Sequence, residues 1–257
     1  MTPFLVLARR ELRADVKRGF RGFRIFLACL ALGVATIAAA GELTVAVQAG
    51  IDADSRSLLG GDITISQSYH ALDADVRLWL EDRGKLTQRA EMRAMVKAAN
   101  GERSLVELKA VDGAYPLYGE LRTEPQDIDL SASHEGAFPA LADPGLIERL
   151  QVKQGDIVEL GTARLRVAGA ILAEPDKVAS PFLLGPRLMI SHQALEASGL
   201  LMPGSIVRHI AGVALHPDRG AIATMKELEQ RFKGAVWRIR SFDEAAPGLK
   251  RFLDNLS

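Results

Sequence analysis

The side chains that could carry catalysis or hold a metal are scattered along this 257-residue sequence. The five histidines stand far apart and lack metal-ligand spacing, which is typical of surface or half-buried groups (His70, His134, His192, His209 and His216). His134-Glu135 could support acid–base chemistry, but its spacing from other residues suggests no partner. The sequence also lacks the nucleophile-elbow, phosphate-loop, zinc-protease and dinucleotide-binding motifs.

Two other features could suggest a reactive group. Glu174 and Asp176 flank Pro175, which fixes a turn that we expect to point the two carboxylates apart, into solvent. Cys29, the single cysteine, stands within an apolar run, where burial makes a catalytic or disulfide role improbable. We therefore expect no catalytic residue, metal site or cofactor in this chain, and no enzymatic activity.

Composition narrows the class of protein. The chain is 48% apolar, which excludes a disordered protein, and one cysteine excludes a disulfide scaffold. Its formal net charge is zero, which argues against a nucleic-acid binder. The charge is unevenly spread, because residues 1–24 hold two acidic and seven basic side chains (Arg9, Arg10, Arg13, Lys17, Arg18, Arg21 and Arg24).

An uncharged run of seventeen residues, 25–41, follows this basic segment. As a helix it would span roughly 25 Å, close to the thickness of a bilayer core. The basic flank then predicts a transmembrane helix with a cytoplasmic N-terminus, and the apolar spacing within 1–24 predicts an amphipathic helix on the inner leaflet. A buried helix of a soluble protein and a signal peptide cleaved after Ala40 are the alternatives.

The helical pattern continues beyond this span to Leu59, which predicts a stalk. A continuous rod over 25–59 would be roughly 50 Å long. Gly60 and Gly61 end it, either as a plain helix cap or as the point where the rod passes force to the first strand.

The remaining residues mix strands and short helices without a strict alternation, which predicts the α+β class. Two hairpins are expected, around Asn100-Gly101 and around Gly161-Thr162. A break between subdomains is expected at 120–142, where Pro, Ser, Asp and Gly accumulate. The other predicted elements are strands at 62–66, 187–190, 206–215 and 235–239, and helices at 73–83, 144–150, 191–197, 217–232 and 245–256. The helix at 73–83 is expected to carry Val76, Leu78, Trp79 and Leu80 on one side, and Asp143 and Ser191 are expected to cap the two helices that follow them.

Five phrases in this body resemble a known family. They are Gly60–Ile65, Lys109–Gly119, Leu150–Gly161, Ala173–Asp176 and Gly185–Ile190. In this order, after a basic N-terminus and one span, they resemble the start of an FtsX-like ABC transporter permease. The nearest similarity is to the YbbP group, in the superfamily that includes MacB and LolC/LolE.

This resemblance implies a cytoplasmic helix at 1–24, a span and stalk at 25–59, a MacB-like periplasmic core domain at 60–244, and a helix at 245–257 that leads toward a second span. It implies a bacterial inner-membrane protein whose main domain is periplasmic and whose partner is a separate ABC ATPase that binds the ATP. It also implies export or extraction of hydrophobic or lipid-like cargo, and a dimer or pseudo-dimer formed through the rest of the permease.

The family plan needs more than one span, so the resemblance predicts that this chain is an N-terminal fragment. Arg9, Arg10, Arg13 and Lys17 would then lie along the inner leaflet near the ATPase and face lipid phosphate, or else serve only to set the topology. Arg24 would snorkel at one end of the span. Two rival hypotheses are a membrane-anchored periplasmic scaffold that recruits a hydrolase, and a secreted α+β hydrolase. Tyr115-Pro116-Leu117-Tyr118 is expected to form a structural corner with wet hydroxyls, or else a contact surface.

Overall fold

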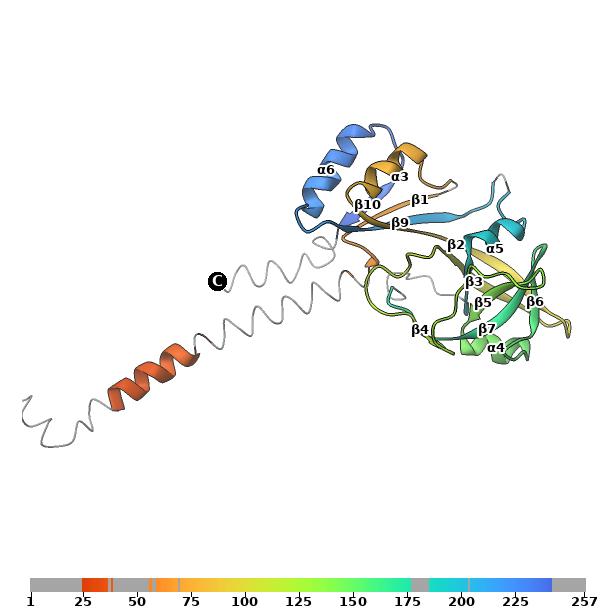
Figure 1. Ribbon diagram of the computed structural model, residues 1–257, viewed down its shortest axis with the longest axis horizontal. Coiled ribbons are helices and arrows are strands. Elements are labelled where there is room, and N and C mark those ends of the chain that lie inside the picture. Colours follow the sequence, from red (N-terminus) through yellow and green to blue (C-terminus); the bar gives the residue numbers. More distant parts are fainter. Residues whose placement is uncertain are drawn as a thin grey trace, which may run out of the picture. The chain divides into compact units, whose positions relative to one another are not determined.

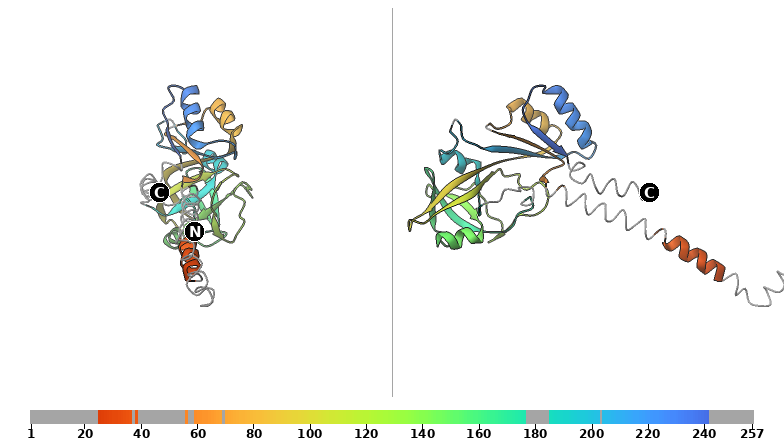
Figure 2. Two further views of the ribbon diagram at one scale, coloured as in Figure 1. Left: turned by 90° about the vertical axis from the view of Figure 1, so that its left-hand side faces the viewer. Right: turned by 180° about the vertical axis from the view of Figure 1, so that it is seen from behind.

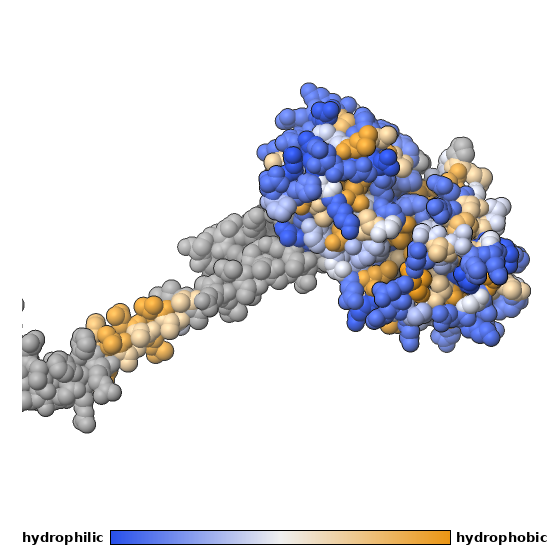
Figure 3. Space-filling view, viewed as in Figure 1, coloured by the Kyte–Doolittle hydropathy of each residue, from blue (hydrophilic) through white to orange (hydrophobic). Residues whose placement is uncertain are grey.

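The structure, a computed structural model, describes residues 25–36, 38, 56, 59–68, 70–176, 185–202 and 204–241. The chain divides into two compact units, Met1–Ile51 and Asp52–Ser257, and each is described by itself. In the first unit, residues 25–36 are helical and expose every large apolar side chain (Ile25, Phe26, Leu27, Leu30, Leu32 and Val34), as Figure 3 shows.

Within the described residues, no helix combines the length and the apolar character needed to cross a bilayer. The predicted span at 25–41 and the stalk to Leu59 remain predictions, because residues 37, 39–55, 57 and 58 lie outside the described part of the chain. The helices expected at 1–24 and 245–256 lie outside it too.

The second unit is built on one mixed sheet, in the order β10-β1-β9-β2-β3-β8-β5-β7-β4, with β6 paired to β2 and β7 (Figure 1). Neighbouring strands are antiparallel except β3 with β8 and β5 with β7. The strands are β1 (Ile63–Ser68), β2 (Gly84–Ala98), β3 (Arg103–Val111), β4 (Arg122–Glu124), β5 (Phe138–Ala142), β6 (Ile157–Leu160), β7 (Ala163–Ala173), β8 (Arg187–Ser191), β9 (Arg208–Leu215) and β10 (Arg238–Ser241).

Four helices of this unit pack on the sheet, which confirms a mixed α/β domain. They are α3 (Ala74–Glu81), α4 (Pro144–Leu150), α5 (His192–Ala197) and α6 (Ala221–Arg231). Helices α3 and α6 lie side by side over β1, β9 and β10, as the two opposite views of Figures 1 and 2 agree. Their buried side chains, among them Trp79 and Leu228, form one core with Ile63, Ile65 and Val213 of the sheet.

Local sequence signals explain most element boundaries. Both predicted hairpins are present, and Gly101 at the first turn has a φ of +94°, a conformation that favours glycine. The carboxylate of Asp143 caps α4 by accepting from the Gly145 amide at 2.9 Å. The Ser191 hydroxyl caps α5 by accepting from the Ala194 amide at 3.3 Å.

Three expectations differ from the structure. Leu78, which we placed on the buried side of its helix, is 61% exposed, because in this short helix Val76, Trp79 and Leu80 face the sheet. The last strand runs over Arg238–Ser241 instead of 235–239, and α6 begins four residues later than predicted, at Ala221. The break between subdomains expected at 120–142 stays a prediction; this segment contributes β4 and β5, both of which pair with β7.

Candidate functional site

A cluster of charged side chains, most of them buried, lies on one face of four adjacent strands, β9, β2, β3 and β8. Glu91 of β2 is in register with Arg208 of β9 and with Lys109 of β3, and directly opposed side chains share a face. Alternate residues of a strand share a face too, which adds Arg89 and, through the register of β3 with β8, Arg187. Two carboxylates that follow β7, those of Glu174 and Asp176, complete the group. We call these seven residues the charge cluster.

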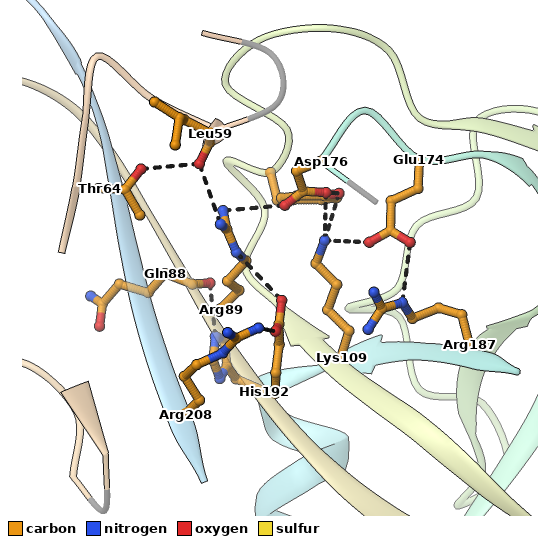
Figure 4. Close-up of polar contacts among 12 residues, drawn as sticks. Leu59, Thr64, Gln88, Arg89, Lys109, Glu174, Asp176, Arg187, His192 and Arg208 are labelled. Atoms are coloured by element: carbon orange, nitrogen blue, oxygen red, sulfur yellow. Dashed lines mark hydrogen bonds and ion pairs between the residues drawn. The ribbon is translucent and has the colours of Figure 1, made fainter. Parts of the chain in front are cut away.

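Lys109 stands at the centre of the charge cluster and is only 1% exposed. Its ammonium group donates to Glu174 Oε1 and to Asp176 Oδ1 at 2.7 Å (Figure 4). It also donates to the hydroxyl of Tyr115 at 2.8 Å. The Tyr115 hydroxyl in turn donates to Asp176 Oδ1 at 2.6 Å. An ammonium group has three hydrogens, so these contacts satisfy it, and this makes a buried lysine tolerable.

The expectation that Glu174 and Asp176 point apart into solvent is wrong. Their side chains are 0% and 2% exposed, and both converge on Lys109. Arg187 Nε lies 3.2 Å from the second oxygen of Glu174, and Arg89 Nη1 lies 3.3 Å from the second oxygen of Asp176. Residues two apart in a chain can project to the same side, and here the turn at 174–176 lies against the sheet with both carboxylates facing it.

Burial and charge have opposite effects on these acids. Burial alone would raise the pKa of Asp176, but the nearby charges of Lys109 and Arg89 more than offset it and lower that pKa to about 2. The same competition lowers the pKa of Glu91, where Arg208 is the largest of the charges that outweigh burial. Burial, together with the two carboxylates, raises the pKa of the Tyr115 hydroxyl far above its usual value. These acids are therefore charged at neutral pH, while the tyrosine is neutral.

The charge cluster also contacts the segment that leads into the first strand. The carbonyl oxygen of Leu59 accepts from Arg89 Nη2 at 3.4 Å and from the Thr64 hydroxyl at 3.0 Å (Figure 4). Gly60 follows with a φ of +74°, and its amide donates to the Arg56 carbonyl at 2.9 Å, as at the end of a helix. A Cβ on Gly60 would stand 2.6 Å from Arg89 Nη1, so another residue here would crowd this guanidinium group as well as strain the backbone.

Asp62 forms a second buried node just beyond these glycines. Its carboxylate accepts from the Leu215 amide and from the Tyr118 hydroxyl, each at 2.8 Å, and pairs with Arg56 Nε at 3.0 Å. Burial and the Asp62 carboxylate raise the pKa of Tyr118 to about 12. The segment on either side of Gly61 is thus held by both the sheet and the Tyr115–Tyr118 loop.

The loop Tyr115-Pro116-Leu117-Tyr118 is half-buried throughout. The expectation that its tyrosine hydroxyls stay wet is wrong, because each one donates to a carboxylate, Tyr115 to Asp176 and Tyr118 to Asp62. The phenol rings therefore join the loop to the charge cluster and to the first strand. A role of this loop as a contact surface stays a prediction.

The histidines are closer in space than in sequence. His192 and His209 both line a cleft of about 460 Å³, which we call the histidine cleft. In it, His192 Nε2 lies 3.0 Å from the Gln88 carbonyl oxygen. Burial, then the charges of His192 and His70, lower the pKa of His209. Among the residues that the structure describes, no three His, Cys, Asp or Glu side chains are placed to hold a metal ion.

The predicted coupling residues divide into two groups. Gly60 and Gly61 lie where the chain meets the charge cluster, whereas the structure does not describe five basic residues (Arg9, Arg10, Arg13, Lys17 and Arg24). Reasoning from sequence missed the charge cluster itself, although Lys109, Glu174, Asp176 and Arg187 all stand in the phrases quoted for the resemblance. A lysine within an apolar strand, at Leu108–Val111, was the available signal.

Comparison with known proteins shows what this chain is similar to. No family model matches it. A sequence match of 33% identity over 181 residues nevertheless relates it to ABC transporter permeases and confirms the resemblance to the FtsX-like, MacB-like permeases of the YbbP group. The relative is described as "Uncharacterized ABC transporter permease YbbP" from Escherichia coli strain K12. The match covers 69% of this chain but 21% of the relative, so the chain spans about a fifth of that protein.

Two solved structures are similar at low identity. The periplasmic region of MacB from Actinobacillus actinomycetemcomitans has a TM-score of 0.45 and 14% identity, and the similarity covers 78% of this chain and 96% of that one. The extracellular domain of YknZ, from Gram-positive bacteria, has a TM-score of 0.47 and 13% identity, over 69% of this chain and 100% of that one.

Proposed function

We propose that this chain is the N-terminal part of an ABC permease subunit that couples ATP hydrolysis in a partner ATPase to movement of the domain at 60–244. In this proposal ATP binds the partner, the N-terminus is cytoplasmic, the domain is periplasmic, and the cargo is hydrophobic or lipid-like. The relationship to the YbbP permease supports the class of protein. The contact between Leu59 and the charge cluster is the observation that carries the coupling role.

The geometry of the contact favours transmission of a displacement. The carbonyl of Leu59 reaches Arg89, Arg89 reaches Asp176, and Asp176 reaches Lys109 on the central strand β3. Close-packed protein interiors transmit strain because they compress little. A pull on the segment before Gly60 would therefore act on the middle of the sheet as well as on β1.

The pairing of the first and last strands supports the same role. Ile63, the first residue of β1, is in register with Ser241, the last residue of β10. The first strand of this sheet therefore begins, and its last described strand ends, at the same corner (Figure 1). Two segments attached at one corner could move the domain when their separation changes.

The experiment reconstitutes the full permease that contains this chain with its ATPase in lipid vesicles. Hydrogen exchange at Gly60–Ile63 and Arg238–Ser241 is compared without nucleotide and with ATP trapped by vanadate. We expect trapping to change the exchange rates at both places. In an Arg89→Met variant the change should be confined to the residues before Ile63, while ATP hydrolysis persists. Arg103→Met is the matched control, because Arg103 is the exposed first residue of β3.

Two results would contradict the proposal. Exchange rates that do not respond to nucleotide would exclude coupling through this corner. Failure of any ABC ATPase to assemble with the intact chain would instead favour the membrane-anchored scaffold.

A further inference from the structure

A cleft of about 640 Å³ lies beside the charge cluster, on the sheet face opposite α3 and α6. Ile63 and Ile65 of β1 pack under those helices, so by the pleat Thr64, Ser66 and Ser68 point to the other face. This face carries hydroxyl groups on β1 and arginines on the strands to either side. All of them line the cleft.

The register places the arginines around these hydroxyls. Arg240 is opposite Thr64, Arg238 is opposite Ser66, and Arg208 is opposite Ser68 on the other side of β1. From the strand spacing and rise, the Cα atoms of Arg238 and Arg208 are roughly 12 Å apart, within joint reach of two arginine side chains. A single anionic group can therefore meet guanidinium groups from both sides.

The positive charge of the cleft is only partly neutralised. Four arginines line it, Arg89, Arg208, Arg238 and Arg240, against the carboxylates of Glu91 and Asp176. Both carboxylates are engaged: Asp176 with Lys109 and Arg89, and Glu91 with Arg208. Within the described residues, no carboxylate pairs with Arg238 or Arg240, and both are exposed. Arg238 and Arg240 therefore give the cleft two positive charges that no described carboxylate neutralises.

Apolar side chains adjoin these arginines. Val236 is 92% exposed, and Trp237, Ile210 and Leu59 also line the cleft. An exposed valine next to these guanidinium groups, with Ile210 and Leu59 also in the lining, suits a ligand with a charged head and an apolar chain.

We propose that this cleft binds an anionic amphiphile, with a phosphate or carboxylate head at Arg238, Arg240 and Ser66 and an apolar chain against Val236. The site deepens the proposed transport function by naming a ligand class, and it rests on that function only for what the ligand does. Guanidinium groups recognise phosphate and carboxylate oxygens by paired, charge-assisted hydrogen bonds. Buried apolar area then distinguishes an amphiphile from a free anion.

The test is a titration of the full chain, in a neutral detergent and without any ATPase. The probes are dodecyl phosphate and inorganic phosphate, and the readout is tryptophan fluorescence in a Trp79→Phe background, which leaves Trp237 beside the cleft as the single emitter. We expect saturable binding of dodecyl phosphate, at least tenfold tighter than binding of inorganic phosphate. The pair Arg238→Gln and Arg240→Gln should weaken dodecyl phosphate binding about tenfold or more.

The controls separate this site from general attraction of anions. Arg103→Gln and Arg164→Gln remove the same charge from exposed strand positions outside the cleft and should leave the affinity within twofold. Val236→Ser should weaken dodecyl phosphate binding and leave inorganic phosphate binding unchanged.

Several outcomes would overturn the inference. If dodecyl phosphate binding does not saturate, or if the two pairs of arginine variants have equal affinities, there is no specific site. Equal affinities for the two phosphates would refute the amphiphile. Because no ATPase is present, these failures leave the coupling proposal standing, and loss of coupling would leave the binding site standing.

Discussion

Replacing Lys109 with methionine should strongly destabilise the second unit. Methionine keeps the length of the side chain but removes the charge that Glu174 and Asp176 share at 0% and 2% exposure. Removing one partner of a buried ion pair typically costs about 3–5 kcal/mol, because the remaining charge is left without compensation. Arg187 and Arg89 stay close to these carboxylates, so we expect about 3 kcal/mol, at the lower end of that range.

A second substitution should recover part of this loss. Asp176→Asn in the Lys109→Met background removes the uncompensated carboxylate while Glu174 keeps Arg187 and Glu91 keeps Arg208. The two substitutions should therefore be non-additive, with a coupling energy of about 1–3 kcal/mol. Lys97→Met is the matched control, because Lys97 pairs with Glu159 at 3.1 Å with both side chains about half exposed, and its loss should cost less than about 1 kcal/mol.

The assay is urea unfolding of the full chain in neutral detergent, followed by tryptophan fluorescence. Both tryptophans of the chain, Trp79 and Trp237, lie in or against the core under α3 and α6. Variants are compared by their midpoints, provided that the dependence on urea is unchanged. The reasoning is refuted if Lys109→Met costs no more than Lys97→Met, or if its effect adds to that of Asp176→Asn.

Acid should expose the same network. The pKa of Asp176 is lowered to about 2 in the folded chain, against 3.8 as its ordinary value. A depressed carboxyl pKa adds stability that is present above the unfolded pKa and is lost as pH falls toward the folded one. At about 1.4 kcal/mol per unit, the contribution is roughly 2 kcal/mol, lost between about pH 4 and pH 2. Lys109→Met removes the largest charge that lowers this pKa, so the variant should lose less stability between about pH 4 and pH 2, as urea unfolding over this range would show.

Three smaller predictions follow from single positions, and urea unfolding checks the first two. Gly60→Ala should cost about 2 kcal/mol or more, because it combines a φ of +74° with a 2.6 Å approach to a guanidinium nitrogen, whereas Gly101→Ala meets open space and should cost about 1 kcal/mol. Leu80→Ala should cost about 2–5 kcal/mol and Leu78→Ala less than about 0.5 kcal/mol, because Leu80 is 0% exposed and Leu78 61%. The pKa of His209, followed by NMR, should lie below the usual histidine value, and an unshifted titration would exclude the burial of His209 in the cleft that it shares with His192.

Most of the secondary structure could be predicted because its signals are local. The Asn100-Gly101 turn, the Asp143 cap and the Ser191 cap each depend on a few neighbouring residues, and the structure has all three. The errors occur where tertiary contacts decide. Leu78 belongs to the apolar set of its helix by spacing alone, but a short helix packed on a sheet buries only one narrow stripe.

The charge cluster could not be predicted in the same way, because its members come from five separate segments of the chain. Lys109 lies 65 residues from Glu174 and 67 from Asp176. The sequence next to either carboxylate does not indicate a buried partner. Propensity rules assign Glu-Pro-Asp to an exposed turn, and the turn itself does form. The burial of its side chains depends on strand register, which a single sequence does not contain.

The buried charges have a consequence for the coupling role that we propose. A core of matched apolar residues would stabilise this sheet as well or better, since replacing a buried ion pair by apolar side chains is often neutral or favourable. Charges instead fix geometry: Lys109 is satisfied only when the 174–176 turn and Tyr115 all contact it, and Arg89 contacts Asp176 and the Leu59 carbonyl together. Displacing Leu59 therefore disturbs contacts that tolerate little misalignment, whereas an apolar core could slide and repack. A charged centre is thus better suited than an apolar one to carry a small movement of the segment before Gly60 into the sheet.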